Sequence, residues 1–161
     1  VDSNPDILQI ARERSAGYTN IRFEQHNLLA LPYPPGSFDV VLCALALHHF
    51  AEKDVVAILR RIREIARVGF IVNDLRRNRV AIWLSTLMAH TILTNPIARF
   101  DTPASCERAF TIAELRALAQ RAGLEHFEIH RHPIFRMALV GRKPSLPATA
   151  GTRDAAGTGR Q

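Results

Sequence analysis

Two apolar segments separated by one amphipathic helix constrain the fold of this chain more than any other feature. The first runs from Phe38 to Leu47 (FDVVLCALAL) and the second from Val68 to Asn73 (VGFIVN). The first is too apolar for a surface strand, so we expect a buried parallel strand that ends near Cys43. After Asp54, apolar residues recur with the helical period, and arginines occupy the opposite face. A strand, a helix and a strand at this spacing predict a parallel crossover unit.

The residues before this unit extend the α/β pattern. Asn4 and Pro5 predict a helix start, because asparagine is a favoured N-cap and proline is favoured in the first turn. Val1 and Asp2 have the character of the end of an earlier strand. Ile21 to Gln25 alternates apolar and polar residues, which predicts a half-exposed strand.

The residues after the unit predict a helical insertion and a hairpin. Val80 to Thr94 is apolar and helical, but its polar residues argue against a membrane span, so we expect a helix packed over a lipophilic pocket. Thr111 to Glu114 is a capping box that opens another helix. Glu125 to His130 and Ile134 to Arg142 predict an antiparallel hairpin with a turn at His132 and Pro133. Residues 144–161 are rich in Pro, Ala, Gly and Thr, and we expect this tail to be disordered.

Composition limits the class of protein. The chain has 161 residues and a net charge of +6, enough for one domain with a core. Its arginines are scattered and lack an aromatic stacking motif, so we interpret them as a solvated face and expect no nucleic-acid partner. Cys43 and Cys106 cannot form a disulfide framework or a zinc site alone, which fits a reducing, cytoplasmic compartment.

Ligands of open α/β sheets bind outside the carboxyl ends of parallel strands, and three such ends carry suitable residues. Asp2 could accept hydrogen bonds from ribose hydroxyls, or it could simply favour a helix N-terminus. Asn27 could contact an adenine amino group, or it could form its own turn. The segment Ala44 to Phe50 (ALALHHF) could place His48 and His49 beside a reaction site, or either histidine could be a hydrogen-bonded structural residue. Adjacent histidines on an extended chain point to opposite sides, so we expect no metal site there.

Three stretches, VDSNPDILQIAR, HNLLALPYPPGSFDVVLCALALHHF and the strand ending IVNDL, together resemble class I methyltransferases of the UbiE-like group, which use S-adenosylmethionine. The resemblance covers residues 1–143. It implies a Rossmann-like α/β fold with a mostly parallel sheet and an antiparallel C-terminal hairpin. It also implies that residues 79–110 form a substrate-lid insertion.

The resemblance implies a role for each candidate residue. Asp2, with Ser3 beside it, would hold the ribose, while Asn27 and the backbone of Leu28 would meet the adenine. Ala44 and His49 would border the methionine part of the cofactor. The candidates for a general base are His48, His49 and Asp74, although Asp74 could instead pair with Arg76 or Arg77. The methyl acceptor would be a small hydrophobic molecule of aromatic, polyketide or quinone type, and peripheral contact with a membrane is compatible with it.

One departure from the family is large. The family binds its cofactor on a glycine-rich loop after its first strand, and this sequence contains no such loop. We therefore expect a truncated domain that lacks the first strand, exposes apolar sheet edges, binds the cofactor poorly and is inactive alone. A non-catalytic binding module is the alternative. A nicotinamide-dependent oxidoreductase is disfavoured, because the only lysines, Lys53 and Lys143, are not suitably placed.

Overall fold

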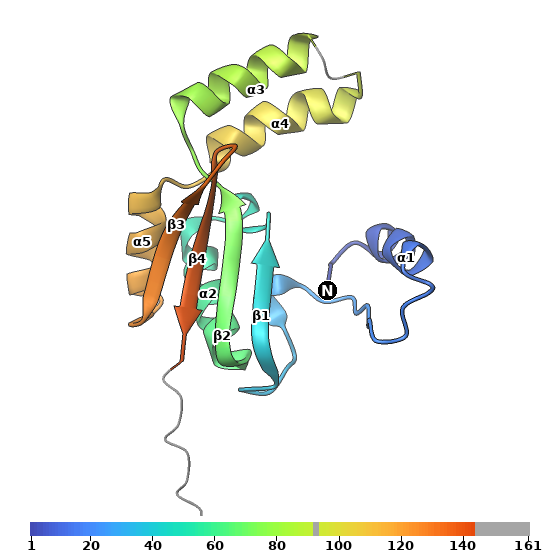
Figure 1. The fold of residues 1–161 in the computed structure, drawn as a ribbon, viewed down its shortest axis with the longest axis vertical. Helices are drawn as coiled ribbons and strands as arrows, with labels where there is room; N and C mark the ends of the chain where they lie inside the picture. Colours follow the sequence, from blue (N-terminus) through green and yellow to red (C-terminus); the bar gives the residue numbers. More distant parts are fainter. Residues whose placement is uncertain (92–93, 144–161) are drawn as a thin grey trace, which may run out of the picture.

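The computed structural model describes residues 1–91 and 94–143, and within helix α4 it leaves the side chains of residues 96–101 undescribed; the expected disordered tail, residues 144–161, lies outside this description. The described strands form one open sheet in the order β1-β2-β4-β3 (Figure 1). Their bounds are β1 Phe38–Ala44, β2 Ala66–Leu75, β3 Phe127–His132 and β4 Arg136–Arg142. β1 and β2 are parallel, whereas β4 is antiparallel to both β2 and β3. The α/β fold with an antiparallel C-terminal hairpin is confirmed. Only one of the three described strand pairs is parallel, so the sheet is less parallel than expected.

Helix α2 (Glu52–Ile65) connects the two parallel strands, and it confirms the predicted crossover. It begins two residues earlier than expected, with Glu52 and Asp54 in its first turn, where carboxylates interact favourably with the helix dipole. Its apolar residues recur at helical spacing and pack against one face of the sheet beside α5 (Ile112–Arg121). Those that are completely buried are Val55, Ile58, Leu59 and Ile62. The main core therefore lies between these two helices and the sheet.

The opposite face of the sheet is open near β1, which corrects the prediction of a buried strand. Val41 and Cys43 face the core, but Val40 is 57% exposed and Leu42 is 67% exposed. β1 is an edge strand, and α2 covers only one of its faces. Alternate side chains of a strand point to opposite faces, so half of the apolar side chains of β1 remain in solvent. The predicted end of the strand near Cys43 is confirmed at Ala44.

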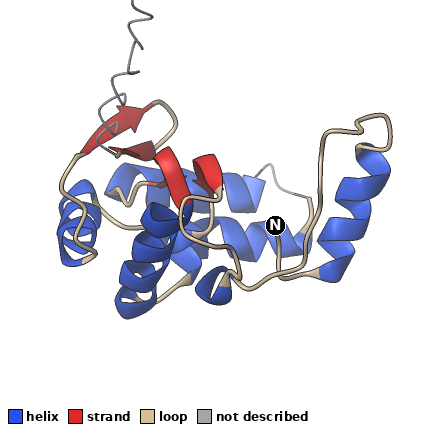
Figure 2. Cartoon of the chain, turned by 90° about the horizontal axis from the view of Figure 1, so that it is seen from below, coloured by secondary structure: helices blue, strands red, loops and turns tan. Residues whose placement is uncertain are grey.

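Before the sheet, helix α1 (Pro5–Arg14) begins as predicted, with the side chain of Asn4 accepting a hydrogen bond from the Asp6 amide. The predicted strand Ile21 to Gln25 is wrong, since only a parallel bridge joins Gln25 to Asp2. Asp2 is the only described residue whose backbone pairs with this segment, which is too little for a ladder. Figure 2 shows α1 standing apart from the helices that cover the sheet.

Helices α3 (Arg79–Thr91) and α4 (Pro96–Arg108) pack together beyond the carboxyl ends of β1 and β2 (Figure 1). We call this helix pair the lid for its position alone, and the substrate-lid role expected for residues 79–110 stays a prediction. The small residues Ala81, Ser85 and Ala89 are buried on one side of α3, which brings the two helices close together. The bulky residues consequently face outward, and Trp83 is 64% exposed. The expectation that α3 packs over a lipophilic pocket is therefore wrong for its described residues. None of the helices among these residues is both long and apolar enough to span a bilayer.

The C-terminal hairpin and the capping box are confirmed. Thr111 caps α5 and exchanges both expected hydrogen bonds with Glu114. The turn between β3 and β4 contains two consecutive residues with positive φ, Ile134 at 58° and Phe135 at 53°. Its tip is joined to the lid base by a 2.7 Å hydrogen bond from the Arg76 amide to the Phe135 carbonyl.

Candidate functional site

A pocket of about 650 Å³ opens between the N-terminal segment and β1, and it extends along the strand from Phe38 to the loop after Ala44. This volume is in the range of pockets that hold nucleotide-sized ligands. The pocket brings together all the residues that the sequence singled out for cofactor binding. They are Asp2, Ser3, Asn27, Leu28, Ala44 and His49. These residues come from three separate stretches of chain, and the fold places them around one cavity.

Asp2 has one carboxylate oxygen directed at its own loop. The Asn4 amide donates a 2.8 Å hydrogen bond to Asp2 Oδ1, which fixes the side chain just before α1. The second oxygen, Oδ2, accepts no hydrogen bond from the described residues. Both interpretations of Asp2 are thus compatible with the geometry, because local structure holds one oxygen and leaves the other for a ligand.

Asn27 forms its own turn, as the alternative interpretation expected. Its Oδ1 atom accepts a 2.9 Å hydrogen bond from the Leu29 amide and caps the short helix η1, Leu28–Ala30. A carbonyl oxygen has two lone pairs, so Oδ1 retains one acceptor position. The cap orients the amide group of Asn27 at the pocket wall, and the side chain has a structural task whether or not a ligand is present.

The loop after β1 is held in an uncommon backbone conformation. Leu45 has a φ of 54°, in the left-handed region that side chains with a β-carbon seldom adopt. Its amide donates a 2.8 Å hydrogen bond to the Asn73 carbonyl at the end of β2. Ala44 and Ala46 flank it and line the pocket, together with Leu45 itself. Such strain at a pocket wall is common at ligand-binding sites, where the surrounding structure maintains it.

His48 and Asp74 form a buried pair that connects this loop to β2. The Nδ1 atom of His48 lies 2.6 Å from Asp74 Oδ1, and Nδ1 carries the proton because a carboxylate only accepts hydrogen bonds. The backbone amides of His48 and Leu75 donate to the same carboxylate, at 3.1 and 2.7 Å. The alternative pairing of Asp74 with Arg76 or Arg77 is wrong, since Asp74 instead bonds to His48.

His49 is the one candidate base that lines the pocket. The predicted opposite orientation of His48 and His49 is wrong, because the short helix η2 (Leu47–His49) replaces the expected extended chain. In this turn the two rings stack, with centroids 4.0 Å apart and planes tilted by 42°. The buried His48 ring therefore packs against the exposed His49 ring on the side away from the pocket. No group of three metal-ligating side chains occurs in the described part of the chain.

An aromatic wall that the sequence interpretation missed lines the same pocket. Tyr33 contacts both His26 and Phe38 edge to face, at centroid distances of 5.6 and 4.8 Å. The Tyr33 hydroxyl donates a 2.5 Å hydrogen bond to Glu24. Burial and this carboxylate raise the pKa of Tyr33 to about 12, and the same hydrogen bond lowers the pKa of Glu24. Tyr33 was not among the predicted site residues, although an aromatic residue shortly before a buried strand was a usable signal.

Cys43 also reaches the pocket but is not a nucleophile at neutral pH. Burial, and secondarily the negative charge of Asp74, raises the pKa of its thiol to about 11. A thiol is nucleophilic mainly as the thiolate. The pocket thus offers hydrogen-bond acceptors at one end, aromatic rings along one wall and a histidine at the loop after β1. It holds no activated cysteine.

Comparisons with known proteins agree with this arrangement. Residues 1–69 match the family model described as a methyltransferase domain. The chain is 34% identical over 70 residues to the uncharacterized methyltransferase YcgJ of Bacillus subtilis, a match that covers 42% of this chain and 26% of that protein. It is 39% identical over 71 residues to the ubiquinone/menaquinone biosynthesis C-methyltransferase UbiE of Hahella chejuensis, covering 42% of this chain and 28% of that protein. The matches thus span only about a quarter of each relative's length.

The fold is also shared with solved methyltransferases. The structure of human N-acetylserotonin methyltransferase in complex with S-adenosylmethionine superimposes with a TM-score of 0.63 at 20% identity. That alignment covers 89% of this chain and 39% of the human chain. The family-model match covers the pocket residues from Asp2 to His49, and the structural match covers 89% of the chain. Residues 1–69 are thus similar to a methyltransferase domain, and the described fold is that of solved methyltransferases.

Proposed function

We propose that this chain provides the adenosine side of a methyltransferase active site that methylates a small, hydrophobic acceptor. The observation that carries the proposal is the convergence of Asp2, Asn27 and the loop after Cys43 on one pocket. S-adenosylmethionine, when bound, supplies a methyl group already activated by the positive sulfur. The residues of the pocket then have to bind, align and shield the reactants rather than activate the donor.

The residues present fit the adenosine part of the cofactor. Asp2 Oδ2 is available to the ribose hydroxyls, and Asn27 Oδ1 retains an acceptor position for the adenine amino group. Tyr33 and Phe38 provide ring faces and edges beside them. The carboxylate of the methionine part of the cofactor would find fewer binding partners, because the described residues that line the pocket include no lysine, arginine or glycine. We therefore expect this chain alone to bind the cofactor weakly, chiefly through its nucleoside.

The acceptor is inferred from chemistry and from the relatives. UbiE acts in ubiquinone and menaquinone biosynthesis, as its name states. Apolar residues line much of the pocket here, including Phe38, Leu42 and Phe50. We assign this protein an acceptor of aromatic, polyketide or quinone type, methylated on oxygen or carbon. Its two cysteines are free thiols, which fits chemistry carried out in the reducing cytoplasm.

His49 is the group we assign to proton removal from the acceptor. It lines the pocket, whereas His48 and Asp74 lie behind it. We therefore treat His48 and Asp74 as positioning residues that hold the ring of His49 in place. A base is required only when the acceptor must lose a proton, as a phenol or an enol does.

The test is an NMR titration of this chain with S-adenosylhomocysteine, which carries the same nucleoside. We expect weak binding, with chemical-shift changes confined to the residues around the pocket. Asp2→Asn should weaken binding by about tenfold, the value of one charge-assisted hydrogen bond. The matched control is Asp39→Asn, which changes an exposed carboxylate that pairs with Arg67 away from the cofactor contacts.

Two results would contradict the proposal. Shift changes that avoid the pocket would show that the nucleoside binds elsewhere or not at all. Equal effects of Asp2→Asn and Asp39→Asn would show that Asp2 is not a specific contact. Tight binding would refute the expectation that the carboxylate end lacks partners in this chain.

A further inference from the structure

The outer face of α3 is an apolar stripe with no partner among the described residues. Five large side chains recur on it at helical spacing, and each is at least one-third exposed. They are Val80, Trp83, Leu84, Leu87 and Met88, with exposed fractions of 55%, 64%, 37%, 45% and 43%. The buried side of the same helix consists of small residues that pack against α4. The stripe is therefore directed away from the molecule, which is unusual for a surface helix.

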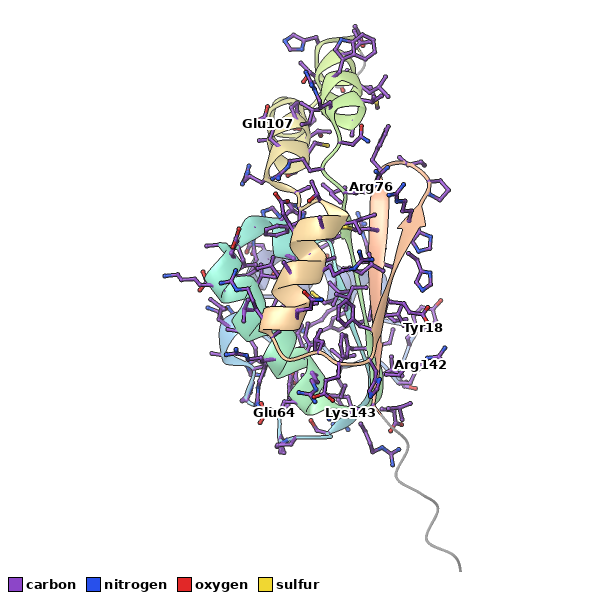
Figure 3. The ribbon with its side chains drawn as sticks, turned by 90° about the vertical axis from the view of Figure 1, so that its left-hand side faces the viewer. Tyr18, Glu64, Arg76, Glu107, Arg142 and Lys143 are labelled. Carbon is purple, nitrogen blue, oxygen red and sulfur yellow. The ribbon has the colours of Figure 1, made fainter. Side chains whose placement is uncertain are left out.

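The charge around the stripe is of one sign. Helix α3 contains no aspartate or glutamate, and Arg79 and His90 border the stripe along one side. The chain as a whole carries a net charge of +6. In Figure 3, Arg76 lies at the base of the lid, whereas Glu107, the acidic residue labelled at this end of the molecule, belongs to α4 and not to α3. An apolar helix face that contains tryptophan and is bordered by basic residues suits the interface of an anionic bilayer.

A second apolar protrusion lies at the same end of the molecule. The β3–β4 turn reaches the base of the lid, and Ile134 at its tip is 85% exposed (Figure 1). The residues on either side of this tip are basic, namely Arg131, His132 and Arg136. Two exposed apolar elements, each flanked by basic and not acidic residues, lie next to each other beyond the carboxyl ends of the strands.

We propose that the lid end of the molecule, the α3 stripe together with the Ile134 turn, docks onto the surface of a membrane that contains anionic lipid. The apolar side chains enter the boundary between headgroups and acyl chains, and the basic residues pair with lipid headgroups. The helix lies in the interface and does not cross it, in agreement with its length of 13 residues. This inference goes beyond the proposed methyl transfer and does not depend on it.

Trp83 makes the inference directly testable, because it is the single tryptophan of the chain. Its fluorescence is recorded as the full chain is titrated with vesicles of phosphatidylcholine alone or of phosphatidylcholine mixed with phosphatidylglycerol. We expect a blue shift and co-sedimentation with the anionic vesicles, both reversed by high salt. Arg79→Gln should weaken binding by about fivefold, and Arg14→Gln on α1 serves as the control for loss of an exposed charge.

The apolar contribution has a closely matched control. Leu87 on α3 and Ile10 on α1 are both 45% exposed, so neither substitution opens the core. Leu87→Gln should weaken vesicle binding by about tenfold, while Ile10→Gln should leave it unchanged. Equal effects of the two variants, equal binding to neutral and anionic vesicles, or no change in Trp83 fluorescence would overturn the inference. A blue shift that depends on protein concentration without vesicles would also overturn it, because it would identify a second copy of the chain as the partner.

Discussion

Replacing Asp74 tests whether one buried carboxylate holds the loop after β1 in place. Asp74 is 2% exposed and accepts three hydrogen bonds, from the His48 ring, the His48 amide and the Leu75 amide. Asp74→Ala leaves these donors without their acceptor in a buried site. Each buried donor left without an acceptor costs about 1–3 kcal/mol, so we expect the variant to lose about 3–5 kcal/mol of unfolding free energy. The variant should therefore lose a large share of the total stability of the chain.

The assay is urea unfolding followed by circular dichroism. With a slope of about 2 kcal/mol per molar urea, a loss of this size lowers the unfolding midpoint by roughly 2 M. Asp74→Asn retains an oxygen acceptor for the Leu75 amide or for the His48 ring, and it should lose less than half as much. It also provides the measurement if Asp74→Ala is already unfolded in buffer. The exposed carboxylate Asp39, replaced by alanine, should change stability by no more than about 1 kcal/mol.

The result that would refute the reasoning is a small effect of the alanine variant. If Asp74→Ala lowers the midpoint by no more than the Asp39→Ala control, the carboxylate does not hold the loop. The His48 contact would then be incidental to the strained conformation of Leu45. In that case the assignment of His48 and Asp74 as positioning residues would also fail.

Two further predictions concern packing and pH. A β-carbon at Gly141 would lie 2.2 Å from the ring of Phe70, so Gly141→Ala should cost about 1–3 kcal/mol of stability in a thermal melt. Gly17→Ala is its control, because nothing lies within 4 Å of a β-carbon there; equal melting temperatures would refute the packing argument. The pKa of Cys43 is raised by burial from 9.0 to about 11, so the folded state retains a proton that the unfolded state loses between these pH values. This contribution to the free energy of unfolding is complete below pH 9, and about 2–3 kcal/mol of it is lost as the pH rises to 11. The urea midpoint of the parent chain should therefore fall between pH 9 and pH 11, and the midpoint of Cys43→Ala should fall less over the same range.

Elements specified by local sequence were predicted well. The crossover of β1, α2 and β2 follows from a period of apolar residues that is visible within about 40 residues. The caps at Asn4 and Thr111 depend on side chains that bond to amides only two or three residues away. The hairpin was predicted because its two strands flank a turn containing proline. In each case the determining interaction lies within a short stretch of chain.

Features that depend on distant residues were not predicted. The contact between His48 and Asp74 joins residues 26 positions apart, and no local pattern distinguishes it from an aspartate paired with a nearby arginine. The exposure of Val40 and Leu42 depends on which strands and helices cover β1, which periodicity does not reveal. The orientation of α3 was missed for a similar reason, since both its small and its bulky faces are apolar. The sequence predicted the helix but not which face would be buried.

The turn at Ile134 and Phe135 destabilises the folded chain, because both residues have a positive φ. Two consecutive left-handed residues with β-carbons cost roughly 1–2 kcal/mol each, a penalty that glycine would not carry. Ile134 is 85% exposed, so its packing within the chain offsets little of this penalty. Evolution towards stability alone would favour asparagine or glycine at this position. A bulky, exposed residue at this position therefore favours a role for its side chain outside the folded domain.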